Sequence, residues 1–276
     1  IATAFFMCQF LSAIVLRNGD LIYNLLTDSH EDLIQLHSLK DNREGNFARI
    51  EFYPKDPKDL IYPSKYILKI DEDRRPEWFD HALEKKTITR LRQILDGMII
   101  VSARPILIGG VYVLGGTAIV DVIKHCKIIS MHGSSTVQEM RGSSTVEVMR
   151  GSSTVKVMYD SSTVKEMYDS STVKVMYGSS TVQVMYDSST VKVMYGSSTV
   201  QEMRGSSTVQ EMRGSSTVQV MLGSSTVRGM YDSSTVKGMC DSSTVKVMRG
   251  SSTVQEMYGS STVQEMRGSS TVKGMC

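Results

Sequence analysis

The nine residues DSSTVKVMY at 169–177, followed without a gap by GSSTVQVMY at 178–186, decide the fold of the C-terminal half of this 276-residue chain. The unit [GD]-S-S-T-V-[KQER]-[VEG]-M-[RYLC] occurs sixteen times in succession from residue 133 to residue 276. Its Val and Met never change, whereas its sixth, seventh and ninth places vary. A fixed period of this length is typical of repeat proteins in which each unit stacks on its neighbours.

The pattern within one unit predicts which side chains face inward. In the unit that opens at Asp169, Ser171 and Val173 share one face of a strand, and Thr172 points the other way. We therefore expect Val173 and Met176 to be buried and Lys174 to be exposed. The opening place holds only Gly or Asp, which suits a tight corner with a positive φ angle.

A single nonapeptide buries too little apolar surface to fold alone, so the repeats predict an all-β domain, a regular β-solenoid (β-helix). Two nonapeptides per coil is the preferred geometry, and three per coil is the alternative. Eight coils of two units, at ~4.8 Å per stacked strand, give a rod of about 38 Å. Low-complexity disorder is a further alternative, but it does not require Val and Met at the same two phases sixteen times.

The composition changes sharply after residue 132, because all five His, all five Pro and the only Trp lie within residues 1–132. We expect a small α+β domain at 1–104, an N-terminal solenoid cap at 105–132 and the solenoid at 133–276. In the cap, Ile119 and Ile128 fall on the phase of the repeat Val, and Met131 falls on the phase of the repeat Met.

The first domain is expected to hold two helices on one side of a mostly antiparallel sheet. The pair Asn18-Gly19 favours a type I′ hairpin turn, Ser29 is a predicted helix cap, and Pro76 suits a first helical turn. The predicted elements, in the order ββαββα, are strands at 10–17 and 20–26, a helix at about 30–39, strands at 48–52 and 66–70, and a helix at 76–98.

Candidate chemical groups in the first domain are few. The cluster His30-Glu31-Asp32, with His37 seven residues after His30 on the same helical face, could hold a metal or support acid/base chemistry. Polar residues that open a helix, however, usually cap it and face solvent. Trp78 is expected in the core. We find no phosphate loop, nucleophile elbow or paired-carboxylate motif, so we predict no catalytic residue, and any activity would have to lie in residues 10–104.

Charge and cysteine content narrow the choice of partners. Residues 1–132 carry 17 Lys and Arg against 17 Asp and Glu, and the repeats carry 14 against 12, so nucleic-acid binding is not expected. The four cysteines lie far apart, and the repeats lack the mid-unit Asp of calcium-binding nonapeptides. We therefore predict no disulfide framework, no metal site and no cofactor.

The two ends of the sequence bear on the location of the protein and on its association with other copies. The apolar run 1–16 is too short for a membrane span and lacks a basic n-region, so a cytoplasmic or phage-associated location is the expectation. The initial Ile and the unterminated last repeat predict a sequence cut at both ends. A last coil that exposes Val272 and Met275 could then associate end to end with another copy.

Several motifs carry a family resemblance. With GSSTVxxM repeats preceded by SHEDLI (29–34), IDEDRRPEWF (70–79) and ILIGGVYVLGG (106–116), the chain resembles uncharacterised proteins of gut bacteria and their phages. The resemblance implies a small α+β domain followed by a short-period β-solenoid. It implies no activity and carries over no functional residue.

The expected function is a non-catalytic structural or binding rod. Its more specific form is a phage or bacterial surface recognition element that contacts a glycan or a protein. One alternative is a carbohydrate-active β-helix enzyme, although near-identical coils offer no cleft of unlike residues. Another is an ice- or crystal-binding face formed by outward hydroxyls. The candidate binding residues are an outward threonine ladder: Thr172, Thr190, Thr208 and Thr226.

Overall fold

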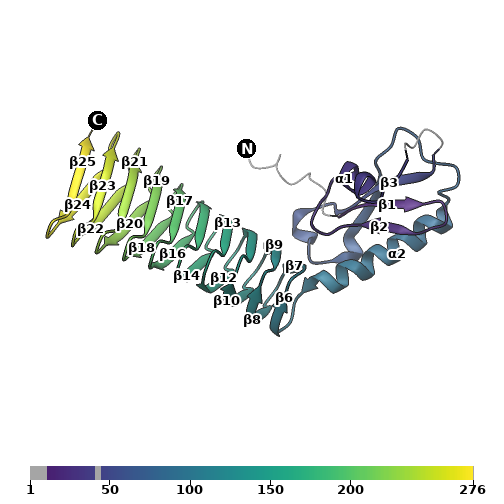
Figure 1. Cartoon of the computed structure of the whole chain (residues 1–276), viewed down its shortest axis with the longest axis horizontal. Coiled ribbons are helices and arrows are strands. Elements are labelled where there is room, and N and C mark those ends of the chain that lie inside the picture. The colour runs from purple at the N-terminus through teal and green to yellow at the C-terminus, as the bar shows by residue number, and fades with distance from the viewer. Residues whose placement is uncertain (1–10, 41–44, 276) are drawn as a thin grey trace. The chain divides into compact units, whose positions relative to one another are not determined.

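The computed structural model of this protein describes residues 11–40 and 45–275, and the chain divides into two compact units, Ile1–Ile99 and Ile100–Cys276 (Figure 1). The division lies a few residues before the expected boundary at 104, because strands of the solenoid already begin at Ile99. Most of the apolar run at 1–16 and the start of the first predicted strand lie outside the described residues.

The first unit has the expected order ββαββα and a four-stranded antiparallel sheet with strand order β2-β1-β3-β4. Its elements are β1 (Leu11–Leu16), β2 (Leu21–Tyr23), α1 (His30–Leu36), β3 (Phe47–Pro54), the short 3-10 helices η2 (Pro57–Asp59) and η3 (Pro63–Lys65), β4 (Tyr66–Ile70) and α2 (His81–Met98).

Both faces of this sheet are buried. On one face Ile14 and Phe47 form a cluster with Leu33 of α1. The opposite face of β3 carries Ala48, Ile50 and Phe52, which are fully buried, and α2 supplies a buried stripe that includes Leu91 and Leu95. The expectation of two helices on one side of the sheet is therefore wrong, because α1 covers one face and α2 covers the other (Figure 1).

The β1–β2 hairpin is confirmed, but its turn is not type I′. The Leu16 N–H donates to the Asp20 carbonyl at 2.9 Å and the Gly19 N–H donates to the Leu16 carbonyl at 2.8 Å. Gly19 has a φ of +85°, whereas Asn18 is not in the positive region. A three-residue loop with one left-handed residue explains this geometry, since it places only the glycine at positive φ.

Both helices are capped, and both differ in extent from the prediction. The Ser29 hydroxyl accepts from the Asp32 N–H, as expected, but α1 ends at Leu36. Helix α2 begins at His81, because the Asp80 carboxylate accepts from the Leu83 N–H at 2.8 Å and caps it there. Residues 76–80 precede the helix.

The second unit is a β-solenoid built from two parallel sheets. Even-numbered strands form a ten-stranded sheet (β6–β24) and odd-numbered strands form an eleven-stranded sheet (β5–β25). The strands before the repeats are β5 (Ile99–Ile100), β6 (Arg104–Ile108), β7 (Val111–Leu114), β8 (Ile119–Lys124) and β9 (Lys127–Met131). The repeat strands are β10 (Thr136–Arg141), β11 (Thr145–Met149), β12 (Thr154–Met158), β13 (Thr163–Met167), β14 (Thr172–Met176), β15 (Thr181–Met185), β16 (Thr190–Met194), β17 (Thr199–Met203), β18 (Thr208–Met212), β19 (Thr217–Met221), β20 (Thr226–Met230), β21 (Thr235–Met239), β22 (Thr244–Met248), β23 (Thr253–Met257), β24 (Thr262–Met266) and β25 (Thr271–Met275).

The register shows two nonapeptides per coil. Val173 in β14 pairs with Val155 in β12 and with Val191 in β16, so each strand lies beside the strand two units away. The preferred coil geometry is thus confirmed, and three units per coil is wrong.

The core follows the predicted phases. Val173, Met176 and Ser171 are fully buried, and the same places are buried in nearly every unit. Lys174 is only partly exposed, so it is less exposed than expected. At β24 and β25 the burial weakens, and Met275 is 78% exposed.

The strands before the first repeat join the same core, with one shift of phase. Ile128 pairs with Val146 and lies on the Val phase as expected. Ile119 instead pairs with Thr136 and is 43% exposed, and it is Val120 that pairs with Val137. The coil from Val120 to Val137 spans 17 residues instead of 18. Counting back from the repeats in steps of nine residues therefore gives Ile119 where the structure has Val120.

The corners explain why the first place of the unit holds Gly or Asp. Gly178 and Asp187 both have positive φ angles, of +66° and +54°. Each of the five corner Asp residues also accepts, through its carboxylate, from the backbone N–H of the corner in the preceding coil, as Asp232 does from Gly214 at 3.0 Å. The Asp residues therefore bind the neighbouring coil, and among the described residues none forms an ion pair with the Lys of its own unit.

Candidate functional site

The four predicted threonines form one row. Thr172, Thr190, Thr208 and Thr226 are direct register partners on β14, β16, β18 and β20 of the even-numbered sheet. Each is partly exposed on the outer face. The Thr172 hydroxyl donates weakly to the Ser170 carbonyl at 3.5 Å, so most of its hydrogen-bonding capacity faces outward.

Three further rows run beside the threonines on β12, β14 and β16, and the sequence prediction missed them. In the units of all three strands the sixth place carries a lysine, the seventh a valine and the ninth, just after the strand, a tyrosine. Together with the threonines they form what we call the tyrosine–lysine strip: Thr154, Thr172, Thr190, Lys156, Lys174, Lys192, Val157, Val175, Val193, Tyr159, Tyr177 and Tyr195.

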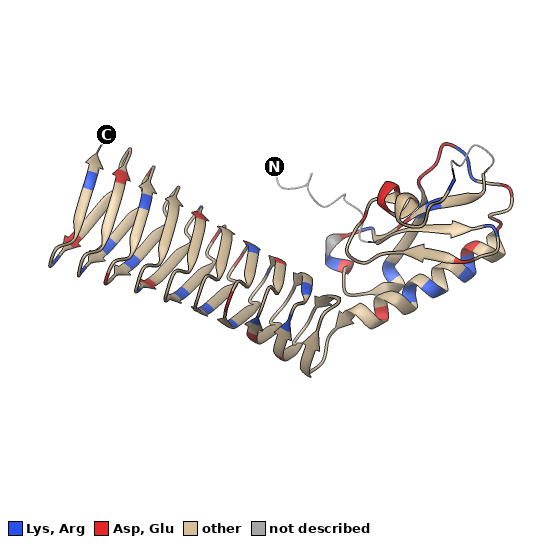
Figure 2. Cartoon of the chain, in the orientation of Figure 1, with Lys and Arg blue, Asp and Glu red and all other residues tan. Residues whose placement is uncertain are grey.

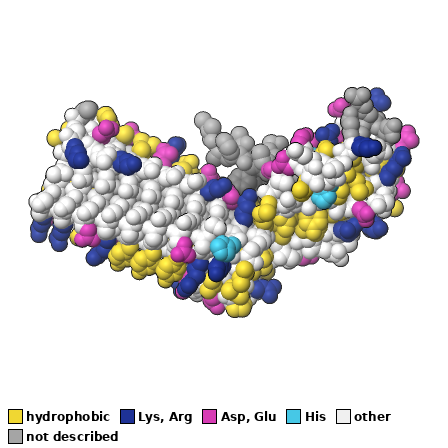
Figure 3. Space-filling view, viewed as in Figure 1, with side chains coloured by type: hydrophobic (Ala, Val, Ile, Leu, Met, Phe, Trp, Pro, Cys, Tyr) yellow, Lys and Arg dark blue, Asp and Glu magenta, His cyan; other side chains and the backbone are white. Residues whose placement is uncertain are grey.

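The tyrosines of the strip stack on one another. The ring centroids of Tyr159 and Tyr177 are 5.5 Å apart and those of Tyr177 and Tyr195 are 5.1 Å apart, with interplanar angles of 11° and 10°. This spacing follows the distance between stacked strands. Tyr177 is 39% exposed. Hydrophobic side chains gather along the edges of the solenoid (Figure 3).

A pair of opposite charges bounds the strip at each end. On β10 the Arg141 guanidinium lies 5.2 Å from the Tyr159 ring centroid and binds Glu139. On β18 Arg213 binds Glu211 in the same way. The seventh place thus changes from Val to Glu at both ends, so the apolar surface is confined to three coils.

The lysines of the strip keep their charge available. Among the described residues, Lys156, Lys174 and Lys192 form no ion pair, and neither Asp nor Glu stands next to them in the sixth-place row of the adjacent coils. On the odd-numbered sheet, by contrast, Lys165 pairs with Glu147 at 2.8 Å. Three stacked, unpaired ammonium groups beside an apolar row are therefore particular to the even-numbered sheet.

The odd-numbered sheet has a shorter aromatic row. Tyr168 and Tyr186 stack with centroids 4.7 Å apart, between Arg150 and Arg204. The Tyr168 hydroxyl donates to Glu166, and burial together with that carboxylate raises the pKa of the phenol. Glu166 and Glu202 alternate with Val148 and Val184 at the place that valine fills throughout the strip, so this face is more polar.

The His30 cluster of the first unit differs from its prediction. Glu31 and Asp32 are exposed, and His37 follows the end of α1, so the structure does not bring these groups together with His30. The His30 side chain is instead 4% exposed and lies with Glu51 of β3 and Asp71 just after β4. Burial and the nearby Asp71 carboxylate raise the pKa of Glu51. No sequence signal links these residues, because the pairing of β3 with β4 brings them together.

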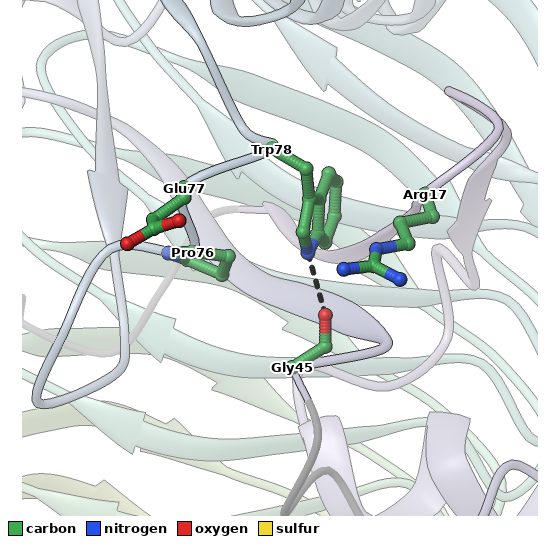
Figure 4. A pocket seen from close by; sticks show the side chains of 5 residues that line it. All are labelled: Arg17, Gly45, Pro76, Glu77 and Trp78. Atoms are coloured by element: carbon green, nitrogen blue, oxygen red, sulfur yellow. Dashed lines mark hydrogen bonds between the residues drawn. The ribbon is translucent and has the colours of Figure 1, made fainter.

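Trp78 lines an open pocket together with Arg17, Gly45, Pro76 and Glu77 (Figure 4). The indole N–H donates to the Gly45 carbonyl at 2.5 Å, and the indole lies close to the Arg17 side chain in the view. The expectation that Trp78 belongs to the core is wrong, since the indole is partly exposed and its neighbour Phe79 is the buried residue.

Charges of both signs are spread over both units (Figure 2). Within the described residues, no helix combines the length and apolar composition that crossing a bilayer requires. Comparisons with protein-family models, with curated proteins and with solved structures found no match to this chain.

Proposed function

We propose that the solenoid is a non-catalytic binding rod and that its tyrosine–lysine strip binds an extended acidic polysaccharide. The observation that carries this proposal is the row of unpaired Lys156, Lys174 and Lys192 beside the stacked, partly exposed tyrosines. A role as a recognition element on a phage or bacterial surface is part of the same proposal.

The strip combines the groups that an acidic polysaccharide requires. Its lysines would neutralise carboxylates or sulfates along the ligand, and its threonine and tyrosine hydroxyls would bond sugar hydroxyls. Because the tyrosine faces are covered by their neighbours, the apolar sugar surface would lie on the valine row and on the ring edges. Successive coils repeat these groups at ~4.8 Å, which suits a linear, repetitive ligand.

A binding role fits this surface better than catalysis. Catalysis needs unlike groups that converge on a reacting atom inside a concave site. The strip repeats the same four side chains on three coils of one sheet face, so each point of the face offers the ligand similar chemistry.

The test is a direct binding measurement on the full chain. A glycan array that includes uronate-rich, sulfated and neutral polysaccharides would identify the ligand class, and calorimetry would give the affinity. Replacing Lys156, Lys174 and Lys192 together by Gln should reduce affinity at least tenfold. Tyr177→Ala, which interrupts the stack at its centre, should also weaken binding.

The matched control is the triple change of Lys237, Lys246 and Lys273 to Gln, which removes the same charge outside the strip. Equal losses in the two triple variants would show that only net charge matters and would contradict the strip. Binding of neutral glycans at the same strength, or release of cleaved product, would contradict the acidic ligand or the non-catalytic role.

A further inference from the structure

We propose that His30, Glu51 and Asp71 form a binding site for one divalent transition-metal ion, of which Zn²⁺ is the reference case. The three side chains each offer one ligand atom, and these atoms lie within 4.8 Å of one another. The site belongs to the first unit and is independent of the function proposed for the solenoid.

The orientation of His30 leaves one ring nitrogen free to act as a ligand. Its Nε2 lies 3.0 Å from the Ile50 carbonyl oxygen, which can only accept, so Nε2 carries a proton and donates it. A histidine that binds a metal usually donates its other N–H to a carbonyl or carboxylate in this manner. The Nδ1 atom then faces the Asp71 carboxylate.

The distance between Nδ1 and Asp71 suits shared coordination. His30 Nδ1 and Asp71 Oδ2 are 3.3 Å apart, longer than a usual charge-assisted hydrogen bond. Two ligands of a tetrahedral Zn²⁺, bound at ~2.0–2.1 Å, are about 3.4 Å apart. The observed separation therefore matches the edge of such a site.

Glu51 provides the second, independent observation. Its side chain is only 5% exposed, and its Oε1 atom has no hydrogen-bond partner. Ser12, its register partner on β1, also has a buried hydroxyl without a partner. A buried carboxylate oxygen that lacks a donor is costly unless a cation compensates it.

The charges and access also fit a divalent ion. One neutral imidazole and two carboxylates would give a neutral complex with M²⁺. Imidazole selects Zn²⁺ and similar ions over Mg²⁺ and Ca²⁺, which prefer sets of oxygen ligands alone. The Asp71 side chain is 42% exposed, so an ion can enter from that side and retain a water as its fourth ligand.

The experiment titrates the full chain, freed of metal by a chelator, with Zn²⁺, Mn²⁺, Mg²⁺ and Ca²⁺ by calorimetry and by thermal unfolding. We expect one high-affinity Zn²⁺ site and a rise in the melting temperature. Glu51→Gln should lower the Zn²⁺ affinity at least tenfold, and the metal-free variant should be at least as stable as the metal-free parent, because a buried charge is removed.

Glu31→Gln is the matched control, since it changes the neighbouring, exposed carboxylate on α1. It should keep the full response to Zn²⁺. Absence of Zn²⁺ binding, equal Zn²⁺ affinity in Glu51→Gln, or a preference for Mg²⁺ or Ca²⁺ would each overturn the proposal.

Discussion

Replacing the buried Ser171 by alanine should stabilise the solenoid, because the structure leaves the Ser171 hydroxyl without a hydrogen-bond partner. Ser171 is fully buried, and its Oγ has no hydrogen-bond partner; the Tyr168 carbonyl accepts from the Ser171 backbone N–H at 3.2 Å. At the equivalent place, the Ser144 hydroxyl donates to the Arg141 carbonyl at 2.8 Å. Replacement by alanine should therefore stabilise the first site and destabilise the second.

The expected magnitudes follow from the hydrogen-bond inventory. A buried hydroxyl without a partner costs roughly 1–3 kcal/mol, so Ser171→Ala should raise the free energy of unfolding by up to about that amount. Ser144→Ala removes a formed hydrogen bond and should lower the free energy of unfolding by about 1 kcal/mol. Both changes delete the same atom at the same place in the unit.

The assay is urea unfolding of the full chain, followed by circular dichroism, with midpoints compared at unchanged slope. Urea midpoints that shift in opposite directions would support the structure. If Ser171→Ala lowers the midpoint as much as Ser144→Ala does, the Ser171 hydroxyl is bonded in solution, and the reasoning about unpaired hydroxyls in the core is refuted.

Three further predictions address the core, the corners and pH. Val173→Asp buries an unpaired charge and should melt the solenoid far below its normal temperature, whereas Lys174→Glu should be nearly neutral; equal shifts in thermal unfolding would contradict the assigned faces. Asp232→Ala places a non-glycine residue without a side-chain acceptor at a positive φ and should lower the free energy of unfolding by about 1–2 kcal/mol. Asp232→Asn keeps an acceptor oxygen and should lower the free energy of unfolding by less. Urea midpoints of the two variants will show which is the less stable. Burial and the Arg150 charge lower the pKa of His132 below 6.5. The unfolded chain therefore binds that proton more readily, and stability should fall as pH drops through about 6.5. A His132→Gln variant should show a flatter decline in urea midpoint between pH 7.5 and 5.5, and an unchanged decline would refute the assignment.

The sequence predicted the solenoid well because its information is periodic. Val173 and Met176 recur at fixed phases, and period-two alternation places the side chains once a strand is assumed. Ile119 shows where this reasoning fails, since one coil is a residue shorter and the nine-residue period no longer identifies the inward-facing residue before it. Trp78 shows a second failure, because apolar spacing extended the predicted helix back to residue 76, although the Asp80 cap starts the helix at His81.

The candidate sites depended on contacts between residues far apart in the chain. Tyr159, Tyr177 and Tyr195 become neighbours only when two units form one coil, although their 18-residue spacing was visible as a signal. His30 meets Glu51 and Asp71 through the strand order of the first sheet, and no local pattern encodes that order.

The coil period is the claim on which both the fold and the strip depend. With three units per coil, Tyr159 would stack on Tyr186, and Lys156 would stack on Gln183, so the strip would not exist. Pyrene labels on paired cysteines can decide, with the four native cysteines replaced by serine. Labels at Thr226 and Thr244, which are register partners on β20 and β22, should give strong excimer emission. Labels at Thr226 and Thr253, 27 residues apart, should give only monomer emission. Excimer emission from the second pair and not from the first would contradict two units per coil and, with it, the tyrosine–lysine strip.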